Sequence, residues 1–218
     1  MFKRKILSKL EAWKRDERHK PLILRGARQV GKTTVVNEFG SQFDNYLYFN
    51  LEMNESVRLF EMDIPLNDLV NMLFASLGKS QREGSTLIFI DEIQNSPKTI
   101  ALLRYFYEQR PDLYVIAAGS LLENLVDVNV SFPVGRVMYM ALRPCSFYEF
   151  LGAIGKTNLL AVLSQKPEYT VVFHEQLMHH FNQYTIIGGM PEAVQRYAET
   201  QDIVAIEDVY ETLVQAYK

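Results

Sequence analysis

The stretch Gly26-Ala-Arg-Gln-Val-Gly-Lys-Thr33 decides the fold of this chain. It has the form G-x-x-x-x-G-K-[ST], whose glycines let the backbone curl so that successive N–H groups point inward at phosphate oxygens. The pattern is meaningful only where an apolar strand precedes it and a helix follows it. Residues 21–24 form a compact apolar run, and residues 35–43 repeat Val and Phe at helical spacing. The context therefore favours a phosphate-binding loop over a glycine-rich turn.

We assign the nucleotide contacts to this loop and the residue after it. The assigned residues are Gly26, Ala27, Arg28, Gln29, Val30, Gly31, Lys32, Thr33 and Thr34. The helix expected to begin near Lys32 adds the positive end of its dipole. Lys32 is expected to reach the β- and γ-phosphates, and the Thr33 hydroxyl to ligate Mg²⁺.

A pair of acidic residues, Asp91-Glu92, directly follows the third apolar run, residues 87–90. A strand that delivers an Asp at its carboxyl end can hold the shell of a Mg²⁺ ion. The adjacent Glu can orient and deprotonate an attacking water. Paired acids also occur at ordinary loop starts, but the upstream loop favours Asp91 as a metal ligand and Glu92 as the base.

Further apolar runs at residues 46–51, 113–118 and 137–142 alternate with helical patterns. Such alternation predicts an α/β fold, a P-loop NTPase with a five-stranded parallel sheet between helices. The fourth strand ends in Ala118-Gly119-Ser120. If it lies between the first and third strands, Ser120 faces the γ-phosphate as a sensor. The alternative for Ser120 is a plain helix N-cap.

The pattern divides the chain into four parts: an N-terminal amphipathic helix at 1–20, a P-loop ATPase core at 21–143, a small helical lid at 144–200 and the start of a linker helix at 201–218. The first helix is expected to align Phe2, Ile6, Leu10 and Trp13 on one face. The last helix carries an apolar stripe of Ile203, Ile206, Tyr210, Leu213 and Tyr217 without a stop signal. We expect it to lead to a further domain; a fraying terminus is the alternative.

Composition narrows the class of protein. The 218 residues carry a net charge of −3 and one cysteine, Cys145, so no disulfide can form within the chain. Cys145 is expected to be a buried apolar residue. Without a secretory signal or an apolar run long enough for a bilayer, the protein is expected to be cytoplasmic, with no membrane partner.

Residues 1–20 hold eight Lys or Arg against three Asp or Glu, which fits either a solvated helix face or contact with nucleic acid. His174, His179 and His180 do not match H-E-x-x-H, so no metal site is expected there.

Together these motifs resemble the AAA+ superfamily, and more narrowly a prokaryotic branch in which an ATPase core precedes an uncharacterised C-terminal domain. The matching stretches are residues 24–33, 89–94, 118–120, 135–136, 142–151 and 188–192. The resemblance implies ATP as ligand, Mg²⁺ as cofactor and a helical lid over the nucleotide. It also implies an arginine that acts on the γ-phosphate, often from a neighbouring subunit. Arg136 is the first choice for it, ahead of Arg143 and Arg196, and this role would require self-association.

The sequence thus predicts Mg-ATP hydrolysis coupled to a conformational change, with Lys32, Glu92, Ser120 and Arg136 as catalytic residues. No [NT]-K-x-D motif occurs, so GTP is disfavoured. The alternatives are a nucleotide-gated switch with slow hydrolysis and a nucleic-acid-binding module regulated by ATP. The sequence does not identify a protein or nucleic-acid partner.

Overall fold

The computed structural model describes residues 2–120, 133–165 and 170–216. The chain forms two compact units. One comprises Ile6–Leu142, and the other comprises Met1–Lys5 together with Arg143–Lys218. The backbone therefore passes from one unit to the other twice, directly before Ile6 and directly after Leu142.

The first unit is built on a five-stranded sheet with the order β2-β3-β4-β1-β5. Its strands are β1 (Leu22–Arg25), β2 (Asn45–Asn50), β3 (Thr86–Asp91), β4 (Leu113–Gly119) and β5 (Met138–Ala141). Every neighbouring pair is parallel. This confirms the predicted α/β fold and places β4 between β1 and β3. Because all strands run the same way, their carboxyl ends meet at one edge of the sheet, where ligands of such folds bind.

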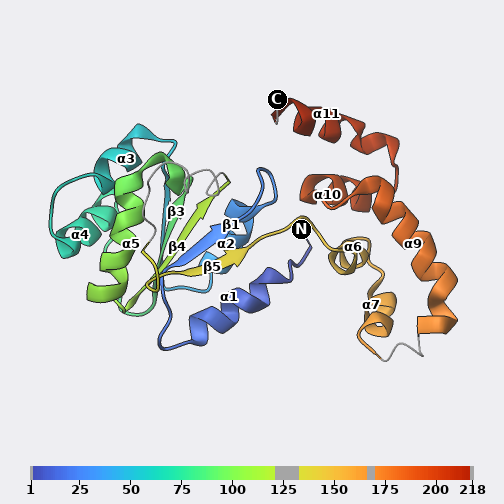
Figure 1. Cartoon of the computed structure of the whole chain (residues 1–218), viewed down its shortest axis with the longest axis horizontal. Helices are drawn as coiled ribbons and strands as arrows, with labels where there is room; N and C mark the ends of the chain where they lie inside the picture. The colour runs from blue at the N-terminus through green and yellow to red at the C-terminus, as the bar shows by residue number, and fades with distance from the viewer. Residues whose placement is uncertain (1, 121–132, 166–169, 217–218) are drawn as a thin grey trace. The chain divides into compact units, whose positions relative to one another are not determined.

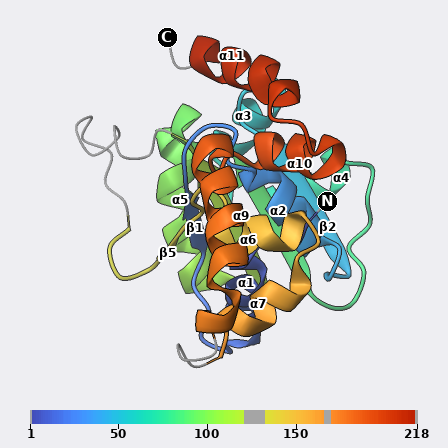
Figure 2. The ribbon, with the colours of Figure 1, turned by 90° about the vertical axis from the view of Figure 1, so that its right-hand side faces the viewer.

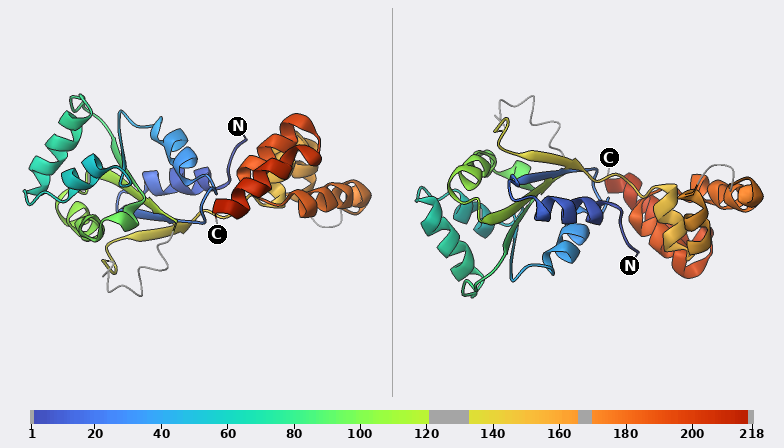
Figure 3. Two further views of the ribbon diagram at one scale, coloured as in Figure 1. Left: turned by 90° about the horizontal axis from the view of Figure 1, so that it is seen from above. Right: turned by 90° about the horizontal axis from the view of Figure 1, so that it is seen from below.

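Helices cover both faces of this sheet (Figures 1 and 3). One face carries α1 (Ile6–Arg15) and α2 (Lys32–Gly40), and the other carries α3 (Asn54–Phe60), α4 (Leu66–Ser76) and α5 (Pro97–Gln109). A single 3₁₀ turn, η1 (Ile93–Asn95), joins β3 to α5. The central strands are buried on both sides, which explains their nearly unbroken apolar sequences.

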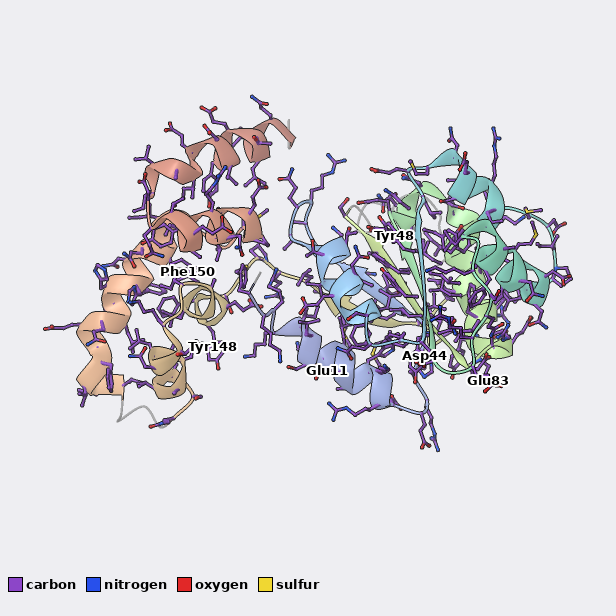
Figure 4. The ribbon with its side chains drawn as sticks, turned by 180° about the vertical axis from the view of Figure 1, so that it is seen from behind. Glu11, Asp44, Tyr48, Glu83, Tyr148 and Phe150 are labelled. Atoms are coloured by element: carbon purple, nitrogen blue, oxygen red, sulfur yellow. The ribbon has the colours of Figure 1, made fainter. Side chains whose placement is uncertain are left out.

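The start of α5 shows how local sequence sets an element. The Ser96 hydroxyl accepts a hydrogen bond from the Thr99 backbone N–H, and Pro97 occupies the first helical position. A serine cap satisfies one otherwise unpaired N–H, and proline has no N–H to lose there. Ser96 and Pro97 therefore define the start of α5. Figure 4 shows Asp44 and Glu83 at the edge where β2 and β3 begin, with Tyr48 further along β2.

The N-terminal segment differs from the prediction. The helix begins at Ile6, and Ile6, Leu10 and Trp13 are buried against the sheet as expected. Phe2, however, precedes the helix and packs in the core of the other unit, near Cys145 and Phe150. The helical-face pattern was wrong at this position because a second apolar core takes up the side chain.

The second unit is helical (Figure 2). Its elements are α6 (Phe147–Ala153), α7 (Thr157–Leu163), η3 (Val171–Phe173), α9 (His174–Ile187), α10 (Pro191–Thr200), η4 (Val204–Ile206) and α11 (Glu207–Ala216). Phe150, labelled in Figure 4, is fully buried between Phe147, Tyr184 and Tyr197. Cys145 is buried as predicted, and burial raises the pKa of its thiol to about 11.

A buried ion pair holds the first residues of the chain in this unit. Arg4 Nε lies 3.0 Å from Glu149 Oε1, and the Arg4 guanidinium also donates to the Arg143 carbonyl over 2.7 Å. Glu149 accepts the Lys5 backbone N–H over 2.8 Å and forms a capping box with Ser146 at the start of α6. One carboxylate therefore caps a helix and fastens the N-terminal segment.

In the C-terminal segment, the 3₁₀ turn η4 directly precedes α11. In α11, Val209 and Leu213 pack with Ala193 of α10. Tyr217 of the predicted stripe lies outside the described residues, and the role of this segment as a linker stays a prediction. Among the residues that the structure describes, no helix is both long and apolar enough to cross a membrane.

Candidate functional site

The predicted phosphate-binding loop joins the end of β1 to the start of α2. Two of its residues have positive φ, Gln29 at 59° and Gly31 at 88°. Gly31 directly precedes α2 in the left-handed conformation, which glycine adopts without steric cost. Left-handed residues within a turn of this kind direct successive N–H groups toward one side and form an anion-binding concavity. The loop therefore has the backbone shape that its sequence predicts.

Gly26 is needed for a different reason, the close approach of another strand. A Cβ at this position would lie 2.4 Å from the Leu142 carbonyl oxygen. The Leu142 N–H in turn donates to the Arg25 carbonyl over 2.7 Å. The residue after β5 is thus packed directly against the first residue of the loop.

Lys32 lies inside the loop. Its ammonium donates to the carbonyls of Gly26 and Ala27, each over 2.9 Å. Burial lowers the pKa of Lys32, and the charges of Glu92 and Asp91 counteract part of that effect. A phosphate in the loop would supply negative charge beside this ammonium and favour its charged form.

Asp91 and Thr33 meet at the carboxyl end of β3. The Thr33 hydroxyl donates to Asp91 Oδ2 over 2.5 Å, and the Glu92 N–H donates to Asp91 Oδ1 over 3.0 Å. Asp91 is 3% exposed, and burial raises the pKa of its carboxyl despite these two donors. A hydroxyl and a carboxylate beside a phosphate-binding loop are the hard oxygen donors that Mg²⁺ takes, together with water and phosphate. The residues present therefore fit this ion.

Glu92 lies one residue beyond β3 with φ 51° and ψ 46°, a left-handed conformation that is uncommon for residues other than glycine. Its Oε2 accepts from Ser120 Oγ over 3.4 Å. Because β3 and β4 are adjacent and parallel, Ser120 at the end of β4 reaches the same edge. The structure thus brings together Lys32, Thr33, Asp91, Glu92 and Ser120.

The structure does not bring Arg136 to this edge. It precedes β5, whose first residue Met138 pairs with Leu22 at the beginning of β1, so Arg136 lies at the edge opposite the loop. Its Nε forms an ion pair of 2.6 Å with Glu108 Oε1, and this partner, with Arg104, lowers the pKa of Glu108. Arg136 therefore cannot act on a nucleotide in its own chain. Arg143 and Arg196 are exposed residues of the helical unit.

Two residues near the site were missed from the sequence. Gln94 donates from Nε2 to Glu92 Oε2 over 2.5 Å. Tyr48 lies on the neighbouring strand β2. Burial raises the pKa of the Tyr48 hydroxyl most, and the nearby Asp91 carboxylate raises it further. The alternation in residues 46–50 places Tyr48 on the face that carries Asp91, and Gln94 belongs to the quoted stretch 89–94. Both positions are visible as patterns in the sequence, but their contacts with Asp91 and Glu92 depend on the tertiary structure.

Among the residues that the structure describes, no group of three or more His, Cys, Asp or Glu residues is arranged to hold a metal ion. This includes the region around His174, His179 and His180. The Mg²⁺ site considered above relies on one carboxylate and one hydroxyl, so it would not form such a group.

Comparison with known proteins agrees with this geometry. A family model described as "AAA domain" matches residues 18–151. No curated protein sequence gives a significant match.

Similar solved structures share the fold at low identity. The Walker-type ATPase of Pyrococcus abyssi has a TM-score of 0.57 and 18% identity over 100% of this chain and 74% of its own. A STAND protein of Pyrococcus horikoshii with a tetratricopeptide repeat sensor has a TM-score of 0.53 and 16% identity, covering 97% of this chain and 32% of its own. The Drosophila ORC bound to DNA has a TM-score of 0.50 and 15% identity, covering 88% and 58%. This chain therefore spans from 32% to 74% of the length of these proteins.

Proposed function

This chain belongs to the AAA domain family of P-loop ATPases, and from that premise we propose that it binds Mg-ATP in the loop of residues 26–34 and hydrolyses it. The observation that carries the proposal is the meeting of Lys32, Thr33, Asp91 and Glu92 at one edge of the sheet. These residues come from two separate segments of the chain. Their side chains are those that phosphoryl transfer to water requires: a cation, metal-binding oxygens and a base.

Each residue has a distinct role in this proposal. The loop N–H groups and the start of α2 bind the phosphates, and Lys32 compensates the charge on the β- and γ-phosphates. Thr33 and Asp91 hold Mg²⁺, which when bound neutralises charge on the phosphate oxygens. Glu92 accepts a proton from water, and Ser120 contacts the γ-phosphate or that water.

The proposed result of hydrolysis is a change in conformation. Leu142 touches Gly26 at the start of the loop and is the last residue before the helical unit. A loop that shifts with the bound phosphate would displace Leu142 and, through the backbone, residue 143. This contact supports coupling between the nucleotide state and the C-terminal unit, which we propose as the lid.

Arg136 is proposed to act between subunits. It lies away from the nucleotide edge of its own chain and is 42% exposed at its side chain. An arginine in that position can reach a phosphate only in a second molecule. The proposal therefore includes self-association in the ATP-bound state.

Steady-state turnover and nucleotide affinity of the purified protein test the function. An ATPase should release phosphate continuously in the presence of Mg²⁺ and stop when the metal is chelated. Tight retention of ATP without turnover would instead favour a nucleotide-gated switch. Absence of ATP binding at millimolar concentration would overturn both.

A further inference from the structure

Gln94 makes a contact that the proposed mechanism does not use. It lies in the 3₁₀ turn η1, two residues after Glu92, and its Nε2 donates to Glu92 Oε2 over 2.5 Å. The same oxygen accepts from Ser120 Oγ over 3.4 Å. Within the described part of the chain, both side-chain hydrogen bonds of Glu92 end at Oε2, and Oε1 accepts none.

The orientation of the Gln94 amide follows from its partner. An ionised carboxylate only accepts hydrogen bonds, so the NH₂ group and not the carbonyl must face Glu92. This orientation turns Gln94 Oε1 into the protein, where it is buried without a hydrogen-bond partner among the described residues. A buried acceptor without a partner is destabilising, and an apolar side chain of the same length would avoid that cost.

The turn that carries Gln94 is held by one side-chain contact to another segment and by its own backbone hydrogen bond. Asn95 Nδ2 donates to the Leu51 carbonyl over 3.3 Å, and the Ser96 N–H donates to the Ile93 carbonyl over 3.1 Å. The Glu92 side chain has three rotatable bonds and begins from a backbone conformation that few non-glycine residues adopt. A fixed donor on this turn can therefore hold a carboxylate that would otherwise be mobile.

We propose that Gln94 is a positioning residue for Glu92. Its amide fixes Oε2 beside Ser120 and leaves Oε1 directed to accept a proton from water. This inference rests on the proposed function of Glu92 as the base. It also explains why a side chain with one unsatisfied buried atom occupies the position: the amide aligns the base at some cost in stability.

Gln94→Met tests the proposal because methionine has the same length and no donor. We expect ATP affinity to be unchanged and kcat to fall by about tenfold to a hundredfold, the scale of a misplaced catalytic group. The melting temperature should be unchanged or higher, because the unsatisfied oxygen is removed. Gln109→Met, the same change at an exposed position of α5, serves as the matched control and should alter neither quantity.

A positioning role lowers kcat without lowering the melting temperature, whereas a packing role lowers both. A Gln94→Met protein that loses melting temperature and turnover together would show a structural role and overturn the proposal, as would one with normal turnover. In a Glu92→Gln background, Gln94→Met should cause no further loss, because it acts through Glu92. A further loss in that background would also overturn it.

A crystallographic comparison makes the test independent of the proposed function. In unliganded Gln94→Met protein, the Glu92 carboxylate should leave Ser120 Oγ. An unmoved carboxylate would overturn the inference whether or not the protein hydrolyses ATP. If the carboxylate moves and the wild-type protein shows no turnover, the positioning role stands and the proposed ATPase function fails.

Discussion

Thr33 and Asp91 are 58 positions apart in the chain, yet the Thr33 hydroxyl donates to Asp91 Oδ2 over 2.5 Å. The contact joins the first turn of α2 to the last residue of β3. It places two oxygen donors where the phosphate-binding loop ends, and both are needed for the proposed Mg²⁺ site.

Removal of the Thr33 hydroxyl should weaken Mg²⁺ binding at the proposed site. Thr33→Val keeps the shape of the side chain but removes one metal donor. We expect the Mg²⁺ concentration for half-maximal ATP binding to rise by about tenfold or more. Thr33→Ser retains the hydroxyl and is the matched control. Equal Mg²⁺ dependence in the valine and serine variants would remove Thr33 from the metal site.

Lys32→Ala should weaken ATP binding. The ammonium already lies inside the loop, and a charged hydrogen bond of this kind contributes about 1.5–3 kcal/mol, or roughly tenfold to a hundredfold in affinity. Isothermal titration measures the change. Lys98→Ala removes an exposed lysine of α5 and should leave affinity unaltered. Unchanged affinity in Lys32→Ala would contradict the phosphate-binding assignment.

Glu92→Gln should separate binding from hydrolysis. The amide is nearly the same size as the carboxylate but cannot accept a proton from water, so turnover should fall by about 10²–10⁴-fold. Mg-ATP affinity should remain close to that of the wild-type protein. Rapid-quench measurement of phosphate release and a parallel binding titration provide both values. Wild-type turnover in this variant would mean that another group activates the water.

Arg136 should act in trans if it acts on phosphate. Arg136→Ala should reduce turnover, and mixing it with Lys32→Ala protein should restore part of the activity, because each variant supplies what the other lacks. Arginines of this kind contribute about 10³–10⁵ in kcat. Arg104→Ala removes the other arginine partner of Glu108 and is the matched control. Specific activity that does not change with protein concentration would exclude the role.

The Arg4–Glu149 pair should stabilise the helical unit in a pH-dependent manner. Burial by itself would raise the pKa of Glu149, but the Ser146 and Lys5 amides and then Arg4 hold it below the ordinary value of 4.5. Because the pKa is lower in the folded state, the carboxylate's contribution is complete above about pH 4.5 and is lost as the pH falls through the folded pKa. Hydrogen exchange at α6 amides should show this loss on acidification.

Breaking the same pair by substitution should have a larger effect. Both side chains are less than 10% exposed, so Arg4→Met leaves a buried carboxylate without its cation and should cost about 3–5 kcal/mol. Glu149→Gln keeps an acceptor for the helix cap and should abolish the pH dependence while retaining part of the stability. An acid profile of Glu149→Gln that matches the wild type would assign the titration to another group.

Much of the sheet was predictable because each strand is marked by a short apolar run in the local sequence. The apolar runs are short, bounded by turns and separated by helical patterns, and they became strands within one or two residues of the predicted limits. Phe2 was misplaced because periodicity cannot show which of two cores a residue joins.

The sequence by itself determined the phosphate-binding loop motif, the strand that ends in Asp91 and a sheet of parallel strands, because backbone geometry and side-chain periodicity act over a few residues. Only the tertiary structure decided the strand order, with β4 between β1 and β3. Tertiary structure alone decided that Leu142 lies against Gly26 and that Arg136 pairs with Glu108 at the opposite edge. It also decided that Gln94 reaches the Glu92 carboxylate. These contacts form between strands and turns that are far apart in the sequence. A local sequence pattern does not show which distant segments pack together.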